Sequence, residues 1–277
     1  MTQNNPLTAY FRQPKHYTPL PSKGRWYANG ALDYPATGEL AIYPMTAKDE
    51  ITLKTPDALL NGQSSVEVIQ SCIPNIKNAW EIPSIDVDTL FISIRIASYG
   101  NDMEISPSCP KCNEVNHYDA DLKQALAFSL SKSWEDVVPV GGLKIHVRPL
   151  TYKQLTDKRL QTFQIQRLSI ELERSDLPVE TKREKFSENF AQLRSIQIEF
   201  VTDSIESIET PDGITVSDRG MIKEFIQNAD RNVYSAVQDI VESNKDELNL
   251  APLHVRCEHC QHEWDQPLEF DSSNFFG

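Results

Sequence analysis

Four of the five cysteines stand in two C-x-x-C pairs, a spacing that suits metal binding. Cys109 and Cys112 lie within S-C-P-K-C-N, and Cys257 and Cys260 lie within R-C-E-H-C-Q. A tight turn between two cysteines points both sulfurs at one ion, and two such turns complete a tetrahedron of thiolates. We therefore expect these four cysteines to hold one zinc ion. Four thiolates leave no open position for water, so the zinc is expected to be structural.

Strand-like sequence flanks both pairs, so each pair is expected at the tip of a β-hairpin. The flanking segments are 103–106 and 115–118 for the first pair, and 253–256 and 264–270 for the second. Two facing hairpins of this kind form a zinc ribbon, and the side chains expected to pack beneath the ion are Tyr118, Leu122, Trp264 and Leu268. The ribbon is split, because 144 residues separate Cys112 from Cys257.

Other uses of these cysteines are disfavoured. A thioredoxin-like pair would open a helix after a strand, and neither pair does so. Disulfides require an oxidising compartment, whereas the start of the chain lacks the apolar stretch of a secretory signal. No run reaches the ~18 to 20 apolar residues of a membrane span, so we expect a cytoplasmic protein. Four histidines on the same elements could each replace a cysteine, although we expect bystanders: His117, His254, His259 and His262.

Two capping boxes mark the starts of helices that follow short strands. Thr46 with Asp49, after strand 40–43, and Thr151 with Gln154, after strand 144–148, each pair a cap with a side chain three residues on. The shared pattern P-[ML]-T-x-K is too short to establish a repeat.

Apolar spacing predicts the remaining elements. Helices are expected over 66–78, 87–98, 122–132 and 151–204, the last broken near 175–178, and Ser217 is expected to cap a helix that runs to 241. Hairpins are expected over 137–147, across Gly141 and Gly142, and over 205–216. The helix 87–98 is apolar nearly all round and should be central, so its Arg95 needs a carboxylate or carbonyl partner. Cys72 is expected to be a small apolar core residue of a helix.

This pattern predicts an α+β fold of mixed helices and short antiparallel hairpins, with a split four-cysteine zinc ribbon and a helical insertion. Four segments are expected. They are an extended basic arm (1–32), an α+β core with the first zinc knuckle (33–150), a helical insertion with a β-hairpin (151–250), and the second knuckle with an aromatic tail (251–277).

Charge is spread unevenly along the chain. The net charge is −13, which disfavours non-specific binding to nucleic acid, but residues 1–32 carry four bases and no acid. Two accounts of this arm remain open. It is either a solvated tail, or a segment that docks on an acidic surface of its own body or of a neighbouring copy, with aromatic residues as anchors.

No motif of a common enzyme class is present, which favours a protein without catalysis. We find no P-loop, dinucleotide-binding, nucleophile-elbow or H-E-x-x-H pattern. Catalytic residues can lie far apart in a sequence, so this observation lowers the expectation of an enzyme without eliminating it.

Several short segments together resemble the baseplate hub protein family of T-even-type contractile-tailed phages. In chain order they are L-P-S-K-G (20–24), W-Y (26–27), P-M-T-A-K-D-E (44–50), S-C-I (71–73), I-R-I-A-S-Y-G (94–100) and C-P-K-C (109–112). The resemblance covers about residues 18–155. It implies a structural or assembly protein that binds other baseplate, hub or tape-measure proteins, in the virion or in the host cytoplasm during assembly.

A zinc-ribbon protein that binds nucleic acid, such as a transcription factor, is the alternative. Such a protein would carry a basic stripe along the ribbon. The knuckles here carry Lys111 and Arg256 against a larger set of acids, Glu114, Asp119, Asp121, Glu258, Glu263 and Asp265. We therefore expect protein partners, with a possible oligomer formed through the arm.

Overall fold

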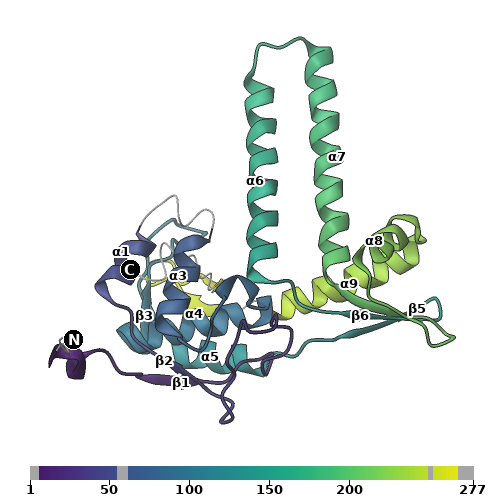
Figure 1. Cartoon of the computed structure of the whole chain (residues 1–277). Helices are drawn as coiled ribbons and strands as arrows, with labels where there is room; N and C mark the ends of the chain where they lie inside the picture. Colours follow the sequence, from purple (N-terminus) through teal and green to yellow (C-terminus); the bar gives the residue numbers. More distant parts are fainter. Residues whose placement is uncertain (1–5, 55–61, 249–251, 268–277) are drawn as a thin grey trace. The chain divides into compact units, whose positions relative to one another are not determined.

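The chain forms two compact units in a computed structural model that describes residues 6–54, 62–248 and 252–267. The first unit joins residues 1–132 to residues 249–277, and the second consists of residues 133–248. Helices and antiparallel strand pairs make up both units (Figure 1). The predicted α+β class is therefore confirmed.

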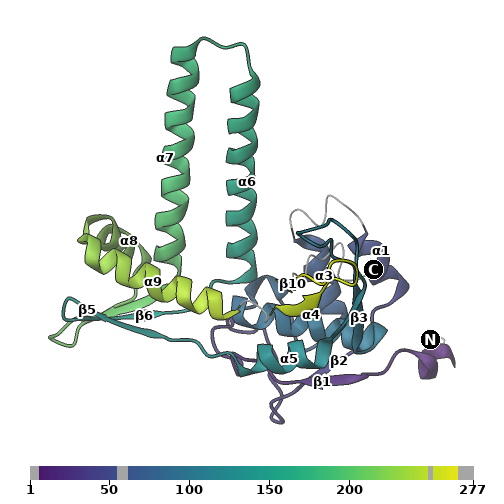
Figure 2. The ribbon, with the colours of Figure 1, turned by 180° about the vertical axis from the view of Figure 1, so that it is seen from behind.

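One long buried helix lies at the centre of the first unit. The elements are η1 (Pro6–Tyr10), β1 (His16–Thr18), β2 (Leu40–Ile42), α1 (Ala47–Leu53), α3 (Gln63–Cys72), η2 (Ala79–Glu81), α4 (Ser84–Tyr99), β3 (Asp102–Ile105), β4 (Tyr118–Asp121), α5 (Leu122–Ser131), β9 (Leu253–Arg256) and β10 (Glu263–Gln266). Leu90, Ile92 and Ile94 of α4 are fully buried, as its all-round apolar sequence predicted. Helices α3 and α5 and the pair β1–β2 contact α4 (Figure 2).

Helix α3 is shorter than predicted. It ends at Cys72, whereas the apolar spacing predicted a helix as far as residue 78. Pro74 explains the difference, because its ring disfavours helical geometry at the preceding residue, and Ile73 has φ −131° and ψ 81°. Ile73 and Ile76 are still buried, but from the segment that follows the helix.

Both predicted capping boxes are present. Thr46 accepts a hydrogen bond from the Asp49 N–H and its own N–H donates to that side chain, and Thr151 and Gln154 repeat the arrangement. Within α4, the Arg95 guanidinium stands 5.1 Å from the centre of the Tyr99 ring. The face of an aromatic ring is thus one partner of this cation, which the sequence had assigned to a carboxylate or carbonyl.

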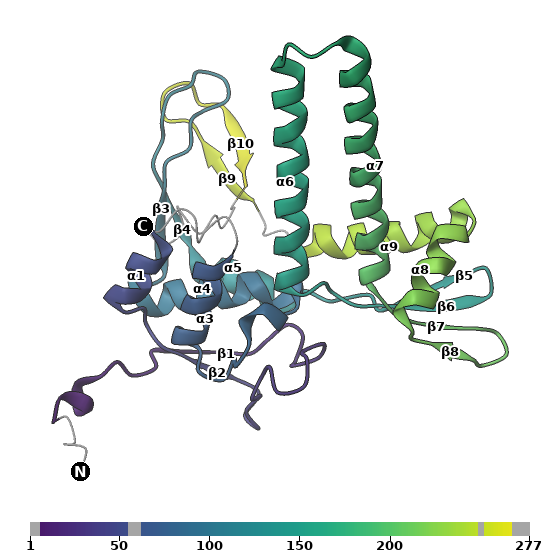
Figure 3. The ribbon, with the colours of Figure 1, turned by 45° about the horizontal axis from the view of Figure 1, so that its top comes forward.

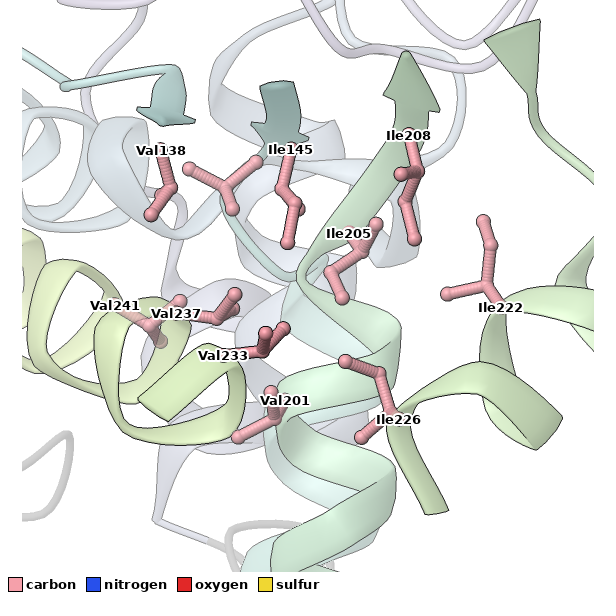
Figure 4. Close-up of a cluster of buried hydrophobic side chains, with 11 residues drawn as sticks. Val138, Ile145, Val201, Ile205, Ile208, Ile222, Ile226, Val233, Val237 and Val241 are labelled. Atoms are coloured by element: carbon pink, nitrogen blue, oxygen red, sulfur yellow. The ribbon is translucent and has the colours of Figure 1, made fainter. Parts of the chain in front are cut away.

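A four-stranded antiparallel sheet and four helices form the second unit. The elements are β5 (Val137–Val140), β6 (Leu143–Val147), α6 (Tyr152–Arg174), α7 (Val179–Asp203), β7 (Ile205–Glu209), β8 (Thr215–Val216), α8 (Arg219–Asn228) and α9 (Arg231–Leu248). The strand order is β5-β6-β7-β8, so the two predicted hairpins join through β6 and β7. The apolar core lies between this sheet and the helices, where Val233 and Val237 of α9 point toward Val138 and Ile145 (Figure 4).

The helix predicted from Ser217 to residue 241 is two helices. Asp218, not Ser217, caps α8, because its carboxylate accepts a hydrogen bond from the Met221 N–H at 2.9 Å. Helix α8 then ends at Asn228. At the start of α9 the Asp230 carboxylate accepts hydrogen bonds from the N–H groups of Asn232 and Val233. A second aspartate cap therefore divides what the apolar spacing predicted as continuous.

Asp86 on α4 binds the segment that connects β1 to β2. It is 0% exposed, and its carboxylate accepts hydrogen bonds from the Ser22 N–H (2.9 Å), the Ser22 hydroxyl (2.5 Å) and the Tyr27 hydroxyl (3.0 Å). Burial raises the pKa of Asp86 to about 6, although these three donors act to lower it. The neighbouring Gly24 has φ +80°, and a Cβ there would lie 3.2 Å from the Tyr34 ring, so this turn requires glycine.

We predict that Asp86 makes the protein less stable as the pH rises from about 4 to about 6. The folded state binds the proton more tightly than the unfolded state, so the stabilising contribution of this group is complete below its unfolded pKa of 3.8 and is lost as the pH passes about 6. Relative to Asp86→Asn, the free energy of unfolding of the parent chain should fall by about 3 kcal/mol across this range.

Urea unfolding at several pH values measures this difference. Asp176→Asn, at an exposed loop position, serves as the matched control and should keep the pH dependence of the parent chain. A difference between parent and Asp86→Asn that does not change with pH would contradict the prediction.

Candidate metal centre

The structure brings all four predicted cysteines together. Their Sγ atoms lie within 4.8 Å of one another, although the two pairs belong to the two separate segments of sequence that make up the first unit. Cys109 lies 3.6 Å from Cys260, and Cys112 lies 3.6 Å from Cys257. Figure 3 shows the β9–β10 tip beside the loop that joins β3 to β4.

These distances fit a tetrahedral thiolate site. Sulfurs held about 2.3 Å from a zinc ion at the corners of a tetrahedron are about 3.8 Å apart. Cys109 and Cys257 are fully buried, whereas Cys112 and Cys260 are partly exposed. Four clustered cysteines of this geometry can bind a metal ion such as zinc. The four thiolates would fill all the coordination positions of a tetrahedral ion, so no position would remain for water or a substrate.

The two knuckles are built in the same way. In each, the N–H of the first cysteine donates to the carbonyl five residues later at 2.8 Å, and its carbonyl accepts from the residue four later at 2.9 or 3.0 Å. The residue after the second cysteine, Asn113 or Gln261, has a left-handed backbone with φ 58° or 57°. This turn is what folds a C-x-x-C pair so that both sulfurs face one point.

Backbone N–H groups also stabilise the thiolate form. The Lys111 N–H lies 3.4 Å from the Cys109 sulfur, and the Cys260 N–H lies 3.5 Å from the Cys257 sulfur. The N–H groups of Cys260 and His259 lower the pKa of the Cys257 thiol to about 6, although burial acts to raise it. A deprotonated sulfur is the form that binds metal, so the fold favours the ligand state of Cys257. At Cys112 a backbone N–H acts to lower the pKa, but burial and hydrogen bonds with the neighbouring sulfurs raise it to about 12.

Side chains join the two knuckle hairpins around the cysteines. The Tyr118 hydroxyl donates to the Arg256 carbonyl at 2.9 Å, and the Tyr118 and Trp264 rings meet edge to face at 6.3 Å. Leu122 is fully buried at the start of α5. The predicted packing of Tyr118 and Trp264 is thus found, whereas Leu268 and Phe270 lie outside the described residues.

Asn116 connects the knuckles and was not predicted. Only 3% exposed, it accepts the Glu258 N–H at 2.9 Å with its side-chain oxygen and donates to the Glu114 carbonyl at 2.9 Å. No short sequence signal would have found it, because alternation along a strand places the apolar Val115 on the buried face, whereas Val115 is 51% exposed and Asn116 is buried.

The four nearby histidines stay outside the sulfur cluster. His117 contacts Ser106 and Glu104, His254 contacts Asp265, and the His262 ring stacks on Trp264. The metal-ligand geometry found among the described residues includes cysteines only.

Cys72 lies apart from the cluster. It is fully buried at the end of α3, and burial raises the pKa of its thiol to about 12. It is therefore a neutral core residue, as the sequence predicted.

Comparison with known protein families matches residues 16–277 to the family described as T4 bacteriophage base plate protein. The chain belongs to this family. The resemblance read from the segments between residues 18 and 155 is confirmed, and the match extends through the second knuckle. No curated protein and no solved structure matches the chain.

Membership places this baseplate protein in the phage tail, in a family of structural proteins, among other baseplate proteins as partners. Within the described ranges, no helix combines the length and apolarity that crossing a bilayer requires.

We predict that the purified chain contains one zinc ion and that Cys257→Ser loses it. Structural zinc contributes folding free energy, so the variant should also lose several kcal/mol, roughly 10 °C in Tm for a protein of this size. Metal content by mass spectrometry and thermal unfolding, with and without a chelator, measure both effects.

Cys72→Ser is the matched control, because it makes the same atomic change in the core of the same unit. Its Tm should fall, since a hydroxyl replaces a buried thiol, while its zinc content stays at one per chain. Equal zinc contents in the two variants would refute the assignment of Cys257 as a ligand.

Proposed function

We propose that this protein is a structural or assembly component of the hub region of the baseplate, and that it acts through protein contacts. Family membership supports a baseplate role, and the motif segments of the first unit support the hub. A structural zinc ion held by Cys109, Cys112, Cys257 and Cys260 stabilises the protein in this proposal. Its functional parts are the four segments 1–32, 33–150, 151–250 and 251–277.

The motif segments that carry the resemblance contact one another around α4. The Met45 N–H donates to the Ser98 hydroxyl at 2.9 Å, and the Tyr99 hydroxyl donates to Glu50 at 3.2 Å. Met45 and Glu50 belong to P-M-T-A-K-D-E, and Ser98 and Tyr99 to I-R-I-A-S-Y-G. These motifs therefore build a scaffold, which is the kind of role that a hub component needs.

One observation supports a role in protein contacts as well as a scaffold role: Arg12 fixes the basic arm to the first unit. Its guanidinium donates to the Ser71 carbonyl (2.7 Å), the Ser71 hydroxyl (2.8 Å) and the Pro44 carbonyl (2.5 Å), and it pairs with Asp49 at 3.2 Å. Asp49 is 8% exposed at its side chain. The part of the arm at Arg12 thus docks on its own chain, and β1 then pairs with β2.

Apolar side chains precede this anchor and face solvent. Leu7, Tyr10 and Phe11 are 61%, 85% and 58% exposed. Three such residues beside an arginine fixed by four contacts form a surface of known position rather than a loose tail. We propose that this surface, residues 7–11, binds a neighbouring baseplate protein or a second copy of the chain.

We predict that Arg12→Ala loosens the arm and lowers stability by roughly 1 to 3 kcal/mol, because Asp49 keeps its burial but loses a charged donor. Limited proteolysis should cleave before residue 16 faster, and the Tm should fall. Lys15→Ala, at the exposed position directly before β1, is the control and should leave both unchanged. Equal proteolysis of both variants would show that Arg12 does not hold the arm.

We predict that deleting residues 1–11 blocks tail assembly while zinc content and Tm stay near those of the full chain. The deletion stops before Arg12, because Thr18 and Leu20 are 0% and 2% exposed and a cut through them would damage the core. Complementation of a phage that lacks the protein, with electron microscopy of the particles, measures assembly. If the truncated chain supports normal tails, residues 1–11 are not needed for assembly and the proposed role of the arm is wrong.

The hub itself is tested by purifying assembly intermediates with a tagged chain. Hub or tape-measure proteins should co-purify, and the tagged chain should locate to the centre of the baseplate or to hub precursors. Association with peripheral baseplate proteins alone would overturn the hub assignment while leaving the family membership intact.

A further inference from the structure

Helix α7 carries an apolar surface that α6 leaves uncovered. An open hollow runs along α7, and its lining includes Val179, Phe186, Phe190 and Leu193. Val179 is 82% exposed and Phe190 is 62% exposed. Large apolar side chains gathered on one open face are typical of interaction sites.

One row of residues on α7 faces α6. Lys182 donates to the Glu173 carbonyl at 3.1 Å, and Asn189 donates to the Ser169 hydroxyl at 3.0 Å. The row therefore consists of positions separated alternately by four and three residues, namely 182, 186, 189, 193 and 196. This is the spacing of a coiled-coil seam.

Six of the lining residues form a second row with the same spacing, at positions 179, 183, 186, 190, 193 and 197, and Lys182, Ser187 and Arg194 lie at its edges. The two rows share Phe186 and Leu193, so they are adjacent stripes on one helix. Two overlapping seams are what a helix with two helical neighbours requires. Helix α6 occupies the first seam, and the second faces solvent.

The hollow is basic in a chain that is acidic. Lys182, Arg183 and Arg194 line it, and no acid is among its lining residues. The chain as a whole has a net charge of −13. An acidic partner is favoured here, because opposite charges around an apolar contact select the partner and speed association. A second copy docking through the same surface would set these bases against one another, which costs binding energy.

We propose that the second seam of α7 binds an amphipathic α-helix of a partner protein, with acidic residues beside its apolar stripe. The stripe packs against Val179, Phe186, Phe190 and Leu193, and its carboxylates pair with the basic side chains. α6, α7 and the bound helix then form a three-helix coiled coil. This surface is independent of the metal centre and of the arm, so it does not depend on the hub proposal.

A designed peptide tests the surface with the full-length protein. The probe is a fluorescein-labelled helix of about four heptads, with Leu and Ile at the seam positions and Glu at the flanking positions. Fluorescence anisotropy should show it bound at least about tenfold more tightly than the same peptide with Lys at the flanks. High salt should weaken the binding, because the charged pairs lie at the rim.

Phe190→Glu and Phe163→Glu form a matched pair. Phe190 lines the hollow, whereas Phe163 of α6 does not, and the two are 62% and 53% exposed. Phe190→Glu should weaken binding by about tenfold or more, and Phe163→Glu by less than about twofold. Arg183→Glu combined with Arg194→Glu should reverse the preference toward the Lys peptide. Circular dichroism should confirm equal helix content in all variants.

Four results would overturn the proposal. The first is equal affinity for the Glu and Lys peptides, and the second is an equal loss in both phenylalanine variants. The third is self-association of the chain that Phe190→Glu removes, which would make a second copy the occupant. The fourth is a single-stranded oligonucleotide that binds more tightly than the Glu peptide and is lost in the double arginine variant.

Discussion

The return of the chain to its own first unit is the constraint on which the structure depends. Cys112 and Cys257 are separated by 144 residues, yet their sulfurs lie 3.6 Å apart. Closing a segment of that length costs on the order of 4 to 5 kcal/mol of chain entropy. Two-stranded hairpins are only marginally stable alone, so the contacts between the knuckles must offset this cost. Asn116 and Tyr118 do so in part, and a bound metal ion would add the largest contribution.

The segment that this closure spans contains the second unit, which has a hydrophobic core of its own. Residues 133–248 pack a four-stranded sheet against α8 and α9, and this core does not need the α6–α7 hairpin beyond its base. Most side chains of the α6–α7 hairpin are therefore free to contact solvent or a partner, because they do not form part of the core. On α6 only Ile165 and Leu172 are buried, whereas Phe163, Leu168 and Ile170 are about half exposed. A pair of helices that buries so little of its own apolar surface is suited to receive a further helix.

Local signals predicted the fold well wherever one physical cause acts within a few residues. Both threonine caps, the Gly141-Gly142 turn and the four cysteines are of this kind. Apolar spacing alone failed where a single residue stops a helix, as Pro74 does after α3 and Asp230 does before α9. The pairing of β6 with β7 and the burial of Asp86 depend on contacts between distant segments, and no short pattern encodes them.

The distribution of charge explains why apolar anchors and bases occur together in this chain. Because the net charge is −13, a surface that binds an acidic partner needs local bases to avoid repulsion. Arg194 beside Phe190 on α7 follows this rule, whereas Arg12 beside Phe11 is already paired with Asp49 of its own chain and anchors the arm. The knuckle strands do not, since Glu263 and Asp265 are already paired with Arg256 and His254 on the neighbouring strand. The two proposed surfaces, residues 7–11 on the first unit and the second seam of α7 on the second, would let the protein join two partners, with the metal-binding ribbon as a support for the unit that carries the arm.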